Sequence, residues 1–335
     1  MGEFTTVAVD AMGGDDAPGV IIKGAVDAVT EKSQLKLELV GDRETIEKEL
    51  SGYTYDKDRV DIRHASQVIS NDESPVAAIR NKKDSSIVVC QKMVRDGQAD
   101  AMVSAGSTGA VLAGGQLIVG RLKGVERAPL APLIPTEKGF SLLIDCGANV
   151  DARPSALVQF AKMGSVYMEH IIGIKDPKVA IVNIGAEEEK GNQLVKETYP
   201  LLKAAKGIHF IGNIEARDIP AGKADVIVCE AFVGNVILKM YEGVASTLFH
   251  KIKEGLMSSV RTKMGALLIK PTLKNLVKQF DAAEYGGAPL LGLKGLVVKS
   301  HGSSNALEIK NSIIQCIAFK EQDISGKIGD MLTDN

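Results

Sequence analysis

The sequence lacks the features that mark several classes of protein. It has no tryptophan, 4% aromatic residues and a net charge of −2, whereas a dedicated nucleic-acid-binding protein normally carries a basic excess. No apolar stretch is long enough to span a bilayer and no secretory signal is present, so we expect a cytoplasmic protein. Low-complexity tracts and linkers are also absent. We therefore expect residues 1–335 to form one continuous unit with a large core.

The four cysteines show no pattern of a metal site or a disulfide framework. No CxxC and no His/Cys cluster occurs, so we expect neither zinc nor disulfides. Cys146 and Cys229 end predicted strands, but neither has the neighbouring histidine that would activate a thiol. The spacing of Asp10, Asp145 and Asp151 matches no metal loop. We expect no metal and no cofactor.

Seven short apolar runs each stop at a glycine-rich polar turn, and helical segments follow most of them. This alternation predicts an α/β fold with a mostly parallel sheet and helices on both faces. The turns lie at 9–15, 104–109, 145–149, 183–192, 212–218, 233–235 and 301–304. In an open sheet such turns gather along one edge, where ligands bind. An anionic ligand is indicated, because glycine leaves backbone amides free to face it.

Two regions depart from this alternation. Residues 124–140 contain three prolines and predict a β-hairpin or an edge pair. Residues 245–285 predict a helical extension of the α/β unit. The predicted strands are 5–10, 35–41, 59–63, 99–104, 130–135, 140–145, 177–184, 208–212, 224–229 and 293–299. The predicted helices are 18–30, 43–50, 75–80, 84–96, 107–121, 154–172, 191–206, 233–256, 258–280 and 303–320.

The turn at 104–109 is the best candidate for an anion site. Ser104, Ser107 and Thr108 supply hydroxyl donors, and Gly106 and Gly109 free the backbone. A helix predicted to start here would add the positive end of its dipole. The alternative is simple N-capping, which needs only one hydroxyl.

The turn at 10–15 is a weaker candidate for an anion site. Gly13 and Gly14 do not make a GxGxxG motif, and the two aspartates that follow them would repel a phosphate.

Positive charge for an anion could come from Lys190 and Arg217, which follow two successive predicted strands. Arginine grips phosphate bidentately and lysine acts as a point charge. The alternatives are a solvated helix start at Lys190 and a salt bridge from Arg217 to Glu215 or Asp218. His301 and Ser303 are close in sequence, but such neighbours seldom form a catalytic pair, and a plain turn with a helix cap is the simpler interpretation.

Residues 251–278 contain seven basic residues and one acid, with apolar residues at helical spacing and a proline that predicts a kink or break. Such a segment suits an anionic membrane surface or the acidic face of a partner. Docking on a second copy of the chain is the alternative. The predicted contact residues are Lys263, Met264, Leu267, Leu268, Lys270 and Lys274.

Eight segments add a more specific pattern. They are Val7–Asp15, Ser104–Ala110, Asp145–Asp151, Gln159–Gly164, Lys190–Asn192, Phe232–Val236, Tyr285–Leu293 and His301–Ser304. In this order, over about residues 6–320, the chain resembles the phosphate acyltransferase family of bacterial phospholipid synthesis. It departs from the family where Ser107 replaces the usual Asn, Ala216 the usual Gly, and Glu230-Ala231 the usual Asp-Gly.

The resemblance implies a three-layer α/β/α fold similar to isopropylmalate dehydrogenases and phosphotransacetylases. It implies acyl transfer from acyl-acyl carrier protein to inorganic phosphate, a homodimer, and peripheral association with the inner face of the membrane. The acyl phosphate would pass to a glycerol-3-phosphate acyltransferase. No nucleic acid is expected.

Phosphate is itself a nucleophile, so the enzyme's task would be positioning and charge stabilisation. In this hypothesis Ser107, Thr108 and nearby amides hold the phosphate, helped by Lys190 and Arg217. Asn149 or Asn183 would donate to the thioester oxyanion, and His301 would protonate the leaving thiolate.

Three rivals remain at this point. A phosphotransacetylase-like enzyme acting on coenzyme A thioesters fits the same residues. A nicotinamide-dependent dehydrogenase fits the fold but lacks a dinucleotide fingerprint. A membrane scaffold without catalytic activity would explain 251–278 but not the polar strand ends.

Overall fold

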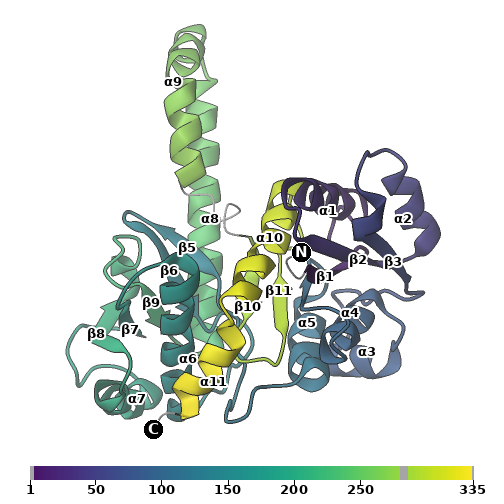
Figure 1. Cartoon of the computed structure of the whole chain (residues 1–335). Helices are drawn as coiled ribbons and strands as arrows, with labels where there is room; N and C mark the ends of the chain where they lie inside the picture. Colours follow the sequence, from purple (N-terminus) through teal and green to yellow (C-terminus); the bar gives the residue numbers. More distant parts are fainter. Residues whose placement is uncertain (1–3, 280–285, 334–335) are drawn as a thin grey trace.

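The strands form two sheets rather than one. The computed structural model describes residues 4–279 and 286–333, with the backbone alone for 274–279. One sheet has the order β10-β11-β4-β1-β2-β3 and the other β5-β6-β9-β7-β8 (Figure 1). All neighbours are parallel except the pairs β10–β11 and β5–β6. The mostly parallel α/β fold is confirmed, and its strand ends are divided between two edges.

The bounds of the elements follow the predicted alternation. The six-stranded sheet contains β1 (Thr5–Asp10), β2 (Leu35–Gly41), β3 (Val60–His64), β4 (Ala101–Ser104), β10 (Ala288–Leu290) and β11 (Leu296–Lys299). The five-stranded sheet contains β5 (Leu133–Thr136), β6 (Gly139–Ile144), β7 (Lys178–Asn183), β8 (His209–Glu215) and β9 (Val226–Val228). The helices are α1 (Gly19–Glu31), α2 (Arg43–Leu50), α3 (Pro75–Asn81), α4 (Ser86–Arg95), α5 (Thr108–Gly114), α6 (Pro154–Tyr167), α7 (Gln193–Ala204), α8 (Ala231–Leu256), α9 (Val260–Gln279), α10 (Ala306–Glu321) and α11 (Ile324–Thr333).

Each sheet is covered on both faces, which gives three layers. Helices α1 and α10 pack on one face of the six-stranded sheet, and α4 on the other. The strand residues alternate accordingly: Val7 and Val9 join the cluster on the α1 side, and Ala8 joins the cluster on the α4 side. Helix α6 covers one face of the five-stranded sheet, and the first turns of α8 cover the other.

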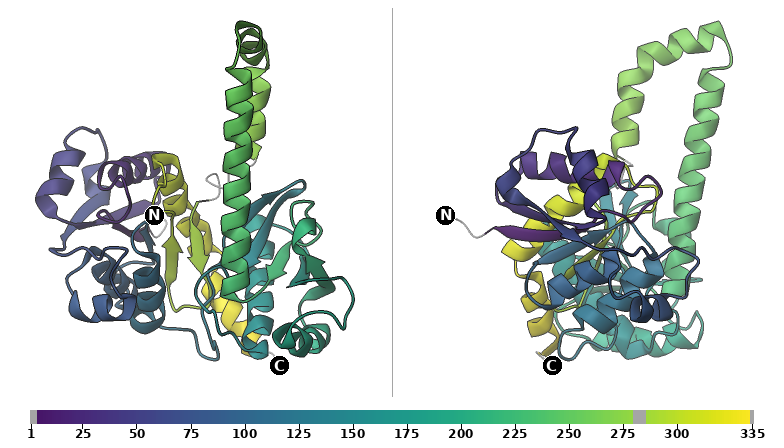
Figure 2. Two further views of the ribbon diagram at one scale, coloured as in Figure 1. Left: turned by 180° about the vertical axis from the view of Figure 1, so that it is seen from behind. Right: turned by 90° about the vertical axis from the view of Figure 1, so that its right-hand side faces the viewer.

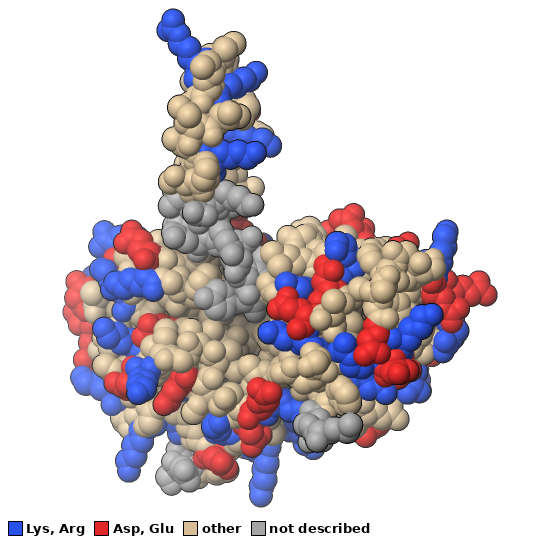
Figure 3. Space-filling model, turned by 45° about the horizontal axis from the view of Figure 1, so that its top comes forward, with Lys and Arg blue, Asp and Glu red and all other residues tan. Residues whose placement is uncertain are grey.

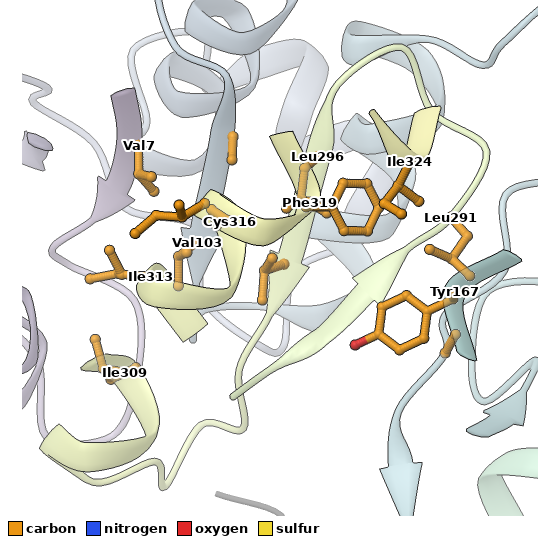
Figure 4. Close-up of a cluster of buried hydrophobic side chains, with 14 of the residues drawn as sticks. Val7, Val103, Tyr167, Leu291, Leu296, Ile309, Ile313, Cys316, Phe319 and Ile324 are labelled. Carbon is orange, nitrogen blue, oxygen red and sulfur yellow. The ribbon is translucent and has the colours of Figure 1, made fainter. Parts of the chain in front are cut away.

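One hydrophobic cluster draws on both sheets. In Figure 4, Val103, Leu296 and Ile313 lie where α10 crosses the six-stranded sheet. Tyr167 of α6 approaches Phe319 of α10, with ring centroids 6.5 Å apart (Figure 4). This shared core favours the expectation of one continuous unit, because burying it links the two sheets energetically.

The proline-rich stretch forms the predicted edge hairpin, with β5 at the end of its sheet and antiparallel to β6. Two elements were missed. The short strand β10 (Ala288–Leu290) lies in a segment predicted as coil, and α11 follows α10 after a two-residue break. Both are short, and short elements give the weakest periodic signal.

The predicted helical extension is a pair of helices that leaves the α/β body. Helices α8 and α9 project together from it (Figure 1). Pro271 lies inside α9, which continues through it, and Figure 2 shows α9 changing direction along its length. The proline therefore does not end the helix, and the change of direction along α9 agrees with the predicted kink. Within the described residues, none of the helices has the length and hydropathy needed to cross a bilayer.

Candidate functional site

Two strand ends of the six-stranded sheet are locked together by a buried carboxylate. Ser104 at the end of β4 donates its hydroxyl to Asp10 at the end of β1, at 2.6 Å. The amide of Gly106 donates back to the Ser104 oxygen at 3.0 Å. A Cβ at Gly13 would lie 2.4 Å from the Asp10 carboxylate, so the close approach of the two loops requires glycine there. Burial raises the pKa of Asp10, and the hydrogen bond from Ser104 opposes that shift. This pair holds two loops of the fold together, which agrees with the prediction that the turn at 10–15 is a weaker candidate for a ligand site than the turn at 104–109.

The loop after β11 completes this edge. The amide of Asp15 donates to the carbonyl of Gly302 at 2.8 Å. His301 Nδ1 lies 2.8 Å from the Ser303 hydroxyl and accepts the Ser303 amide at 3.2 Å. These contacts lie within one turn, as the simpler interpretation predicted, and Asn305 just after it caps α10. With Nδ1 engaged inside the turn, Nε2 is the ring nitrogen left to exchange a proton with a ligand.

A cavity of about 410 Å³ opens between this edge and the second sheet. One wall lies at the edge of the six-stranded sheet and includes Thr108, Lys299, Ser300, His301 and Asn305. The other wall comes from the stretch before and along β5, from the end of β6, and from α8. A concave site with a few convergent polar groups is where small molecules bind most often.

Lys299 is the charged group set most deeply in this cavity. It is the last residue of β11, in register with Ser104, and its side chain is 8% exposed. Its Nζ donates to the carbonyl of Ser300. Burial lowers the pKa of Lys299 from 10.5 to about 8, and the carboxylate of Asp10 opposes the shift. The nearby cation of Lys239 adds to the lowering. Lys239 itself pairs with Glu242 at 2.8 Å, and Glu308 also lines the cavity. The more deeply buried Lys299 is therefore the better candidate to meet an anion.

Most of the 104–109 turn is occupied within the fold. Ser104 and the Gly106 amide bond to each other, and Ser107 is buried and caps α5 by accepting from the amide of Ala110 at 3.5 Å. A Cβ at Gly109 would lie 2.4 Å from Pro75, so this glycine serves the packing of α3. Thr108 alone of the predicted phosphate ligands in this turn lines the cavity. The three hydroxyls therefore overstate the number of donors that can face a ligand.

Asn149 is buried in a second carboxylate network, at the end of β6. Its Nδ2 donates to Asp145 at 2.8 Å and to the carbonyl of Ala128 at 3.1 Å. Both amide hydrogens are thus engaged, and an oxyanion could take one only by displacing a partner. Burial raises the pKa of Asp145, opposed by hydrogen bonds from the Leu130, Ala148 and Gly147 amides and from Asn149. The geometry favours a structural role for Asn149.

The predicted residues after β7 and β8 lie in loops that do not line the cavity. Asn183 donates to the carbonyl of Lys190 at 3.0 Å and accepts from the amide of Ile184 at 2.8 Å, which ties this loop together. The Lys190 side chain is exposed. Arg217 is 78% exposed and pairs with Glu215 at 3.0 Å, the salt bridge considered as the alternative. Their roles in phosphate binding stay predictions.

The four cysteines are buried and unpaired. Burial raises the pKa of Cys146, although this residue borders the cavity, and that of Cys229. A thiol with a raised pKa is a poor nucleophile.

Two of the three departures from the family pattern keep an evident local role. Ser107 caps α5, as asparagine can. Glu230 caps α8 by accepting from the amides of Phe232 and Val233 at 2.6 and 3.0 Å. Ala216 begins a short 3-10 turn after β8.

Sequence reasoning missed several residues that line the cavity: Asn235, Lys239, Glu242, Lys299, Asn305 and Glu308. For Lys299 a signal exists, since a lysine ends an otherwise apolar strand directly before the 301–304 turn. Asn235 lies in the segment 233–235, which was singled out as a strand-end turn although the structure places it inside α8. Lys239 and Glu242 give no signal, because only the packing of α8 beside the strand ends brings them to the cavity.

The chain has an α/β fold similar to that of phosphotransacetylases. A phosphotransacetylase from Streptococcus pyogenes superposes with a TM-score of 0.64 at 18% identity, covering 96% of this chain and 95% of that one. A 4-hydroxythreonine-4-phosphate dehydrogenase from Klebsiella pneumoniae gives 0.53 at 12% identity, covering 94% and 99%. At these identities the likeness concerns the fold alone.

The relatives in sequence are more specific. The family model for fatty acid synthesis proteins matches residues 5–327. A putative phosphate acyltransferase from Clostridium perfringens is 51% identical, covering 98% of this chain and 96% of its own length. A phosphate acyltransferase from Clostridium novyi is 50% identical, with 96% and 97% covered. The chain belongs to this family, the phosphate acyltransferases, and is an enzyme.

Proposed function

We propose that this enzyme transfers a fatty acyl group from acyl-acyl carrier protein to inorganic phosphate and thereby supplies acyl phosphate for phospholipid synthesis. The observation that carries the proposal is the cavity at the carboxyl ends of β4 and β11, where Thr108, Lys299 and His301 converge. Family membership at about half identity supports acyl transfer to phosphate. The carrier protein as donor rests on the resemblance of the motifs.

The chemistry needs no nucleophilic side chain. A phosphate oxygen attacks the thioester carbonyl carbon, the carbon–oxygen bond forms, and the carbon–sulfur bond breaks. The proton that hydrogen phosphate gives up as the new bond forms ends on the departing thiolate, and His301 at the edge of the cavity relays it through Nε2, so that the imidazole ends the step unchanged. Phosphate lies against Thr108 with Lys299 supplying positive charge, and charge stabilisation of this kind is commonly the largest single contribution to catalysis.

Incubation with palmitoyl-acyl carrier protein and phosphate tests the activity. Acyl phosphate should form and be trapped as the hydroxamate by hydroxylamine. Palmitoyl-coenzyme A is the matched donor, and faster turnover with it would favour the phosphotransacetylase-like alternative. Failure of both thioesters would contradict acyl transfer to phosphate.

We also propose that the α8–α9 pair brings the enzyme to the membrane, or to the acidic carrier protein. The side chains of Met264, Leu267 and Leu268 are 67–83% exposed. Lys263 and Lys270 lie among them, and Figure 3 shows basic side chains protruding from this pair of helices. The side chain of Lys274 lies outside the described residues. Apolar and basic groups together suit an anionic lipid surface.

Replacing both leucines, Leu267→Glu and Leu268→Glu, should abolish sedimentation with phosphatidylglycerol vesicles and leave thermal unfolding unchanged. Retained vesicle binding by the folded double variant would contradict the membrane proposal. A raised KM for acyl carrier protein with unchanged vesicle binding would assign the surface to the carrier protein.

A homodimer is proposed along α8. Its exposed apolar residues recur every fourth position, in a row that turns gradually around the helix and that no described residue covers. The row is composed of Phe232, Val236, Met240, Val244, Leu248 and Ile252. Met240→Glu should convert a dimer to a monomer in sedimentation analysis. A monomeric wild type would contradict this proposal. The product's consumer is proposed to be a glycerol-3-phosphate acyltransferase.

A further inference from the structure

The cavity has two walls of different chemistry. The wall from the β4, β11 and α10 side presents hydroxyl, ammonium, imidazole, amide and carboxylate groups. The opposite wall is largely apolar, with Leu130, Pro132–Pro135, Leu238, Tyr241 and Ala245, and α8 adds the polar side chains of Asn235, Lys239 and Glu242 to it. A ligand that fills both must carry a polar group and an apolar body.

The apolar wall is elongated along α8. The residues of α8 that line it run from Asn235 to Ala245, a stretch of about 15 Å at the helical rise per residue. The start of α8 is tied to the strand ends, because the Ala231 amide donates to the carbonyl of Asn149 at 3.1 Å. From there the helix rises away from the body (Figure 1). The wall thus leads from the strand-end site toward the projecting helices.

One hydrogen bond fixes the two sides of this groove. The hydroxyl of Tyr241 donates to the carbonyl of Pro135 at 2.5 Å and so holds α8 against β5. The groove is therefore largely preformed, which lowers the entropic cost of binding a flexible chain.

We propose that this groove between β5 and α8 is the site of the fatty acyl chain. The thioester carbonyl lies at the His301 end, and the chain runs along Leu238 and Tyr241 toward Ala245. The inference rests on the proposed acyl transfer and adds the location of the chain to it. Each methylene buried against the aliphatic wall strengthens binding, so the depth of the groove sets the preferred chain length. The chain end points toward the helices proposed to meet the membrane.

Ala245→Phe tests the groove by filling its far end. Palmitoyl-acyl carrier protein should lose about 30-fold in kcat/KM, the equivalent of two or three methylenes no longer buried. Octanoyl-acyl carrier protein, which does not reach that end, should change less than about threefold on the same reasoning. The matched control is Ser246→Phe, an exposed neighbour on α8 outside the lining, which should leave both donors near wild type.

Leu238→Ala is a second variant that removes wall surface instead of adding bulk. Both acyl chains pass Leu238 near the His301 end, so kcat/KM should fall for both donors by about the same factor. In wild type, a palmitoyl donor with a photoreactive diazirine at its last carbons should label α8 or β5. An unchanged palmitoyl-to-octanoyl ratio in folded Ala245→Phe, unchanged kinetics in folded Leu238→Ala, or labelling elsewhere would overturn the assignment of the chain to this groove. A wild type that forms acyl phosphate from neither donor would overturn the proposed function, and the groove with it.

Discussion

The two sheets end in loops of different character, although their sequences look alike. At the six-stranded edge, the buried Asp10–Ser104 pair joins neighbouring loops and Lys299 faces a cavity. At the ends of β7 and β8 in the five-stranded sheet, Lys190 is exposed and Arg217 is paired with Glu215 in solvent. The same pattern of strand, glycine and polar turn thus serves a cavity in one place and an exposed loop in the other. The difference suggests that a cation interacts strongly with a bound anion when it is desolvated beside a cavity, and weakly when water surrounds it.

Replacing one lysine at each sheet edge tests the difference between the two edges most directly. We expect Lys299→Met to lower kcat/KM for phosphate about 100-fold or more, since removing one group that stabilises the transition-state charge has this effect. The matched variant Lys190→Met should cost less than about tenfold, because water screens an exposed charge. Steady-state kinetics with phosphate as the varied substrate measure both. A larger loss at Lys190 would move the phosphate to the five-stranded edge.

The pH dependence of phosphate use is a second test of whether the Lys299 cation acts in the site. Because the pKa of Lys299 is lowered to about 8, kcat/KM for phosphate should fall about tenfold per pH unit above that value as the cation is lost. Between pH 8 and 10.5 the unfolded chain holds a proton that the folded chain has released, so the free energy of unfolding rises with pH across this range. Lost activity in that range is therefore separable from unfolding.

In Lys299→Arg the fall should move to higher pH, because the guanidinium stays charged. A wild-type profile that Lys299→Arg does not change would remove Lys299 from the site.

A smaller effect is expected from the second buried carboxylate network. Asn149→Ala should lower the free energy of unfolding by about 2 kcal/mol, because it leaves Asp145 without one donor in a buried setting. Asn192→Ala, which removes an exposed helix cap, should cost about 1 kcal/mol. Urea denaturation compares them. A loss of turnover above tenfold in Asn149→Ala without loss of stability would instead make Asn149 the oxyanion donor.

The smallest effect concerns the exposed pair at the end of β8. Arg217→Ala should change the free energy of unfolding by less than about 1 kcal/mol, as surface ion pairs do. The KM for phosphate should also stay near wild type. A large rise in that KM, with Glu215→Ala as the control that frees the arginine, would restore Arg217 as a phosphate ligand.

The sequence predicted the elements well because both faces of each sheet are buried. Runs such as Val7–Val9 and Leu142–Ile144 are apolar throughout, and glycine or proline marks the limits of most helices. The hairpin at β5–β6 followed from its prolines. The candidate site was predicted less well. Thr108 and His301 were found, but the roles of Ser104 and Ser107 were overestimated because the bonds that occupy them come from tertiary packing.

By itself the sequence determined the α/β class, the projecting basic helices and the family, since local periodicity and the order of motifs carry that information. Only the tertiary structure decided that the strand ends fall on two separate sheets, and that α8 closes a cavity against one of them. It also decided which lysine is buried. Desolvation depends on neighbours that are remote in the chain. The sequence around a lysine at the end of a strand therefore does not show whether its side chain faces a cavity or water.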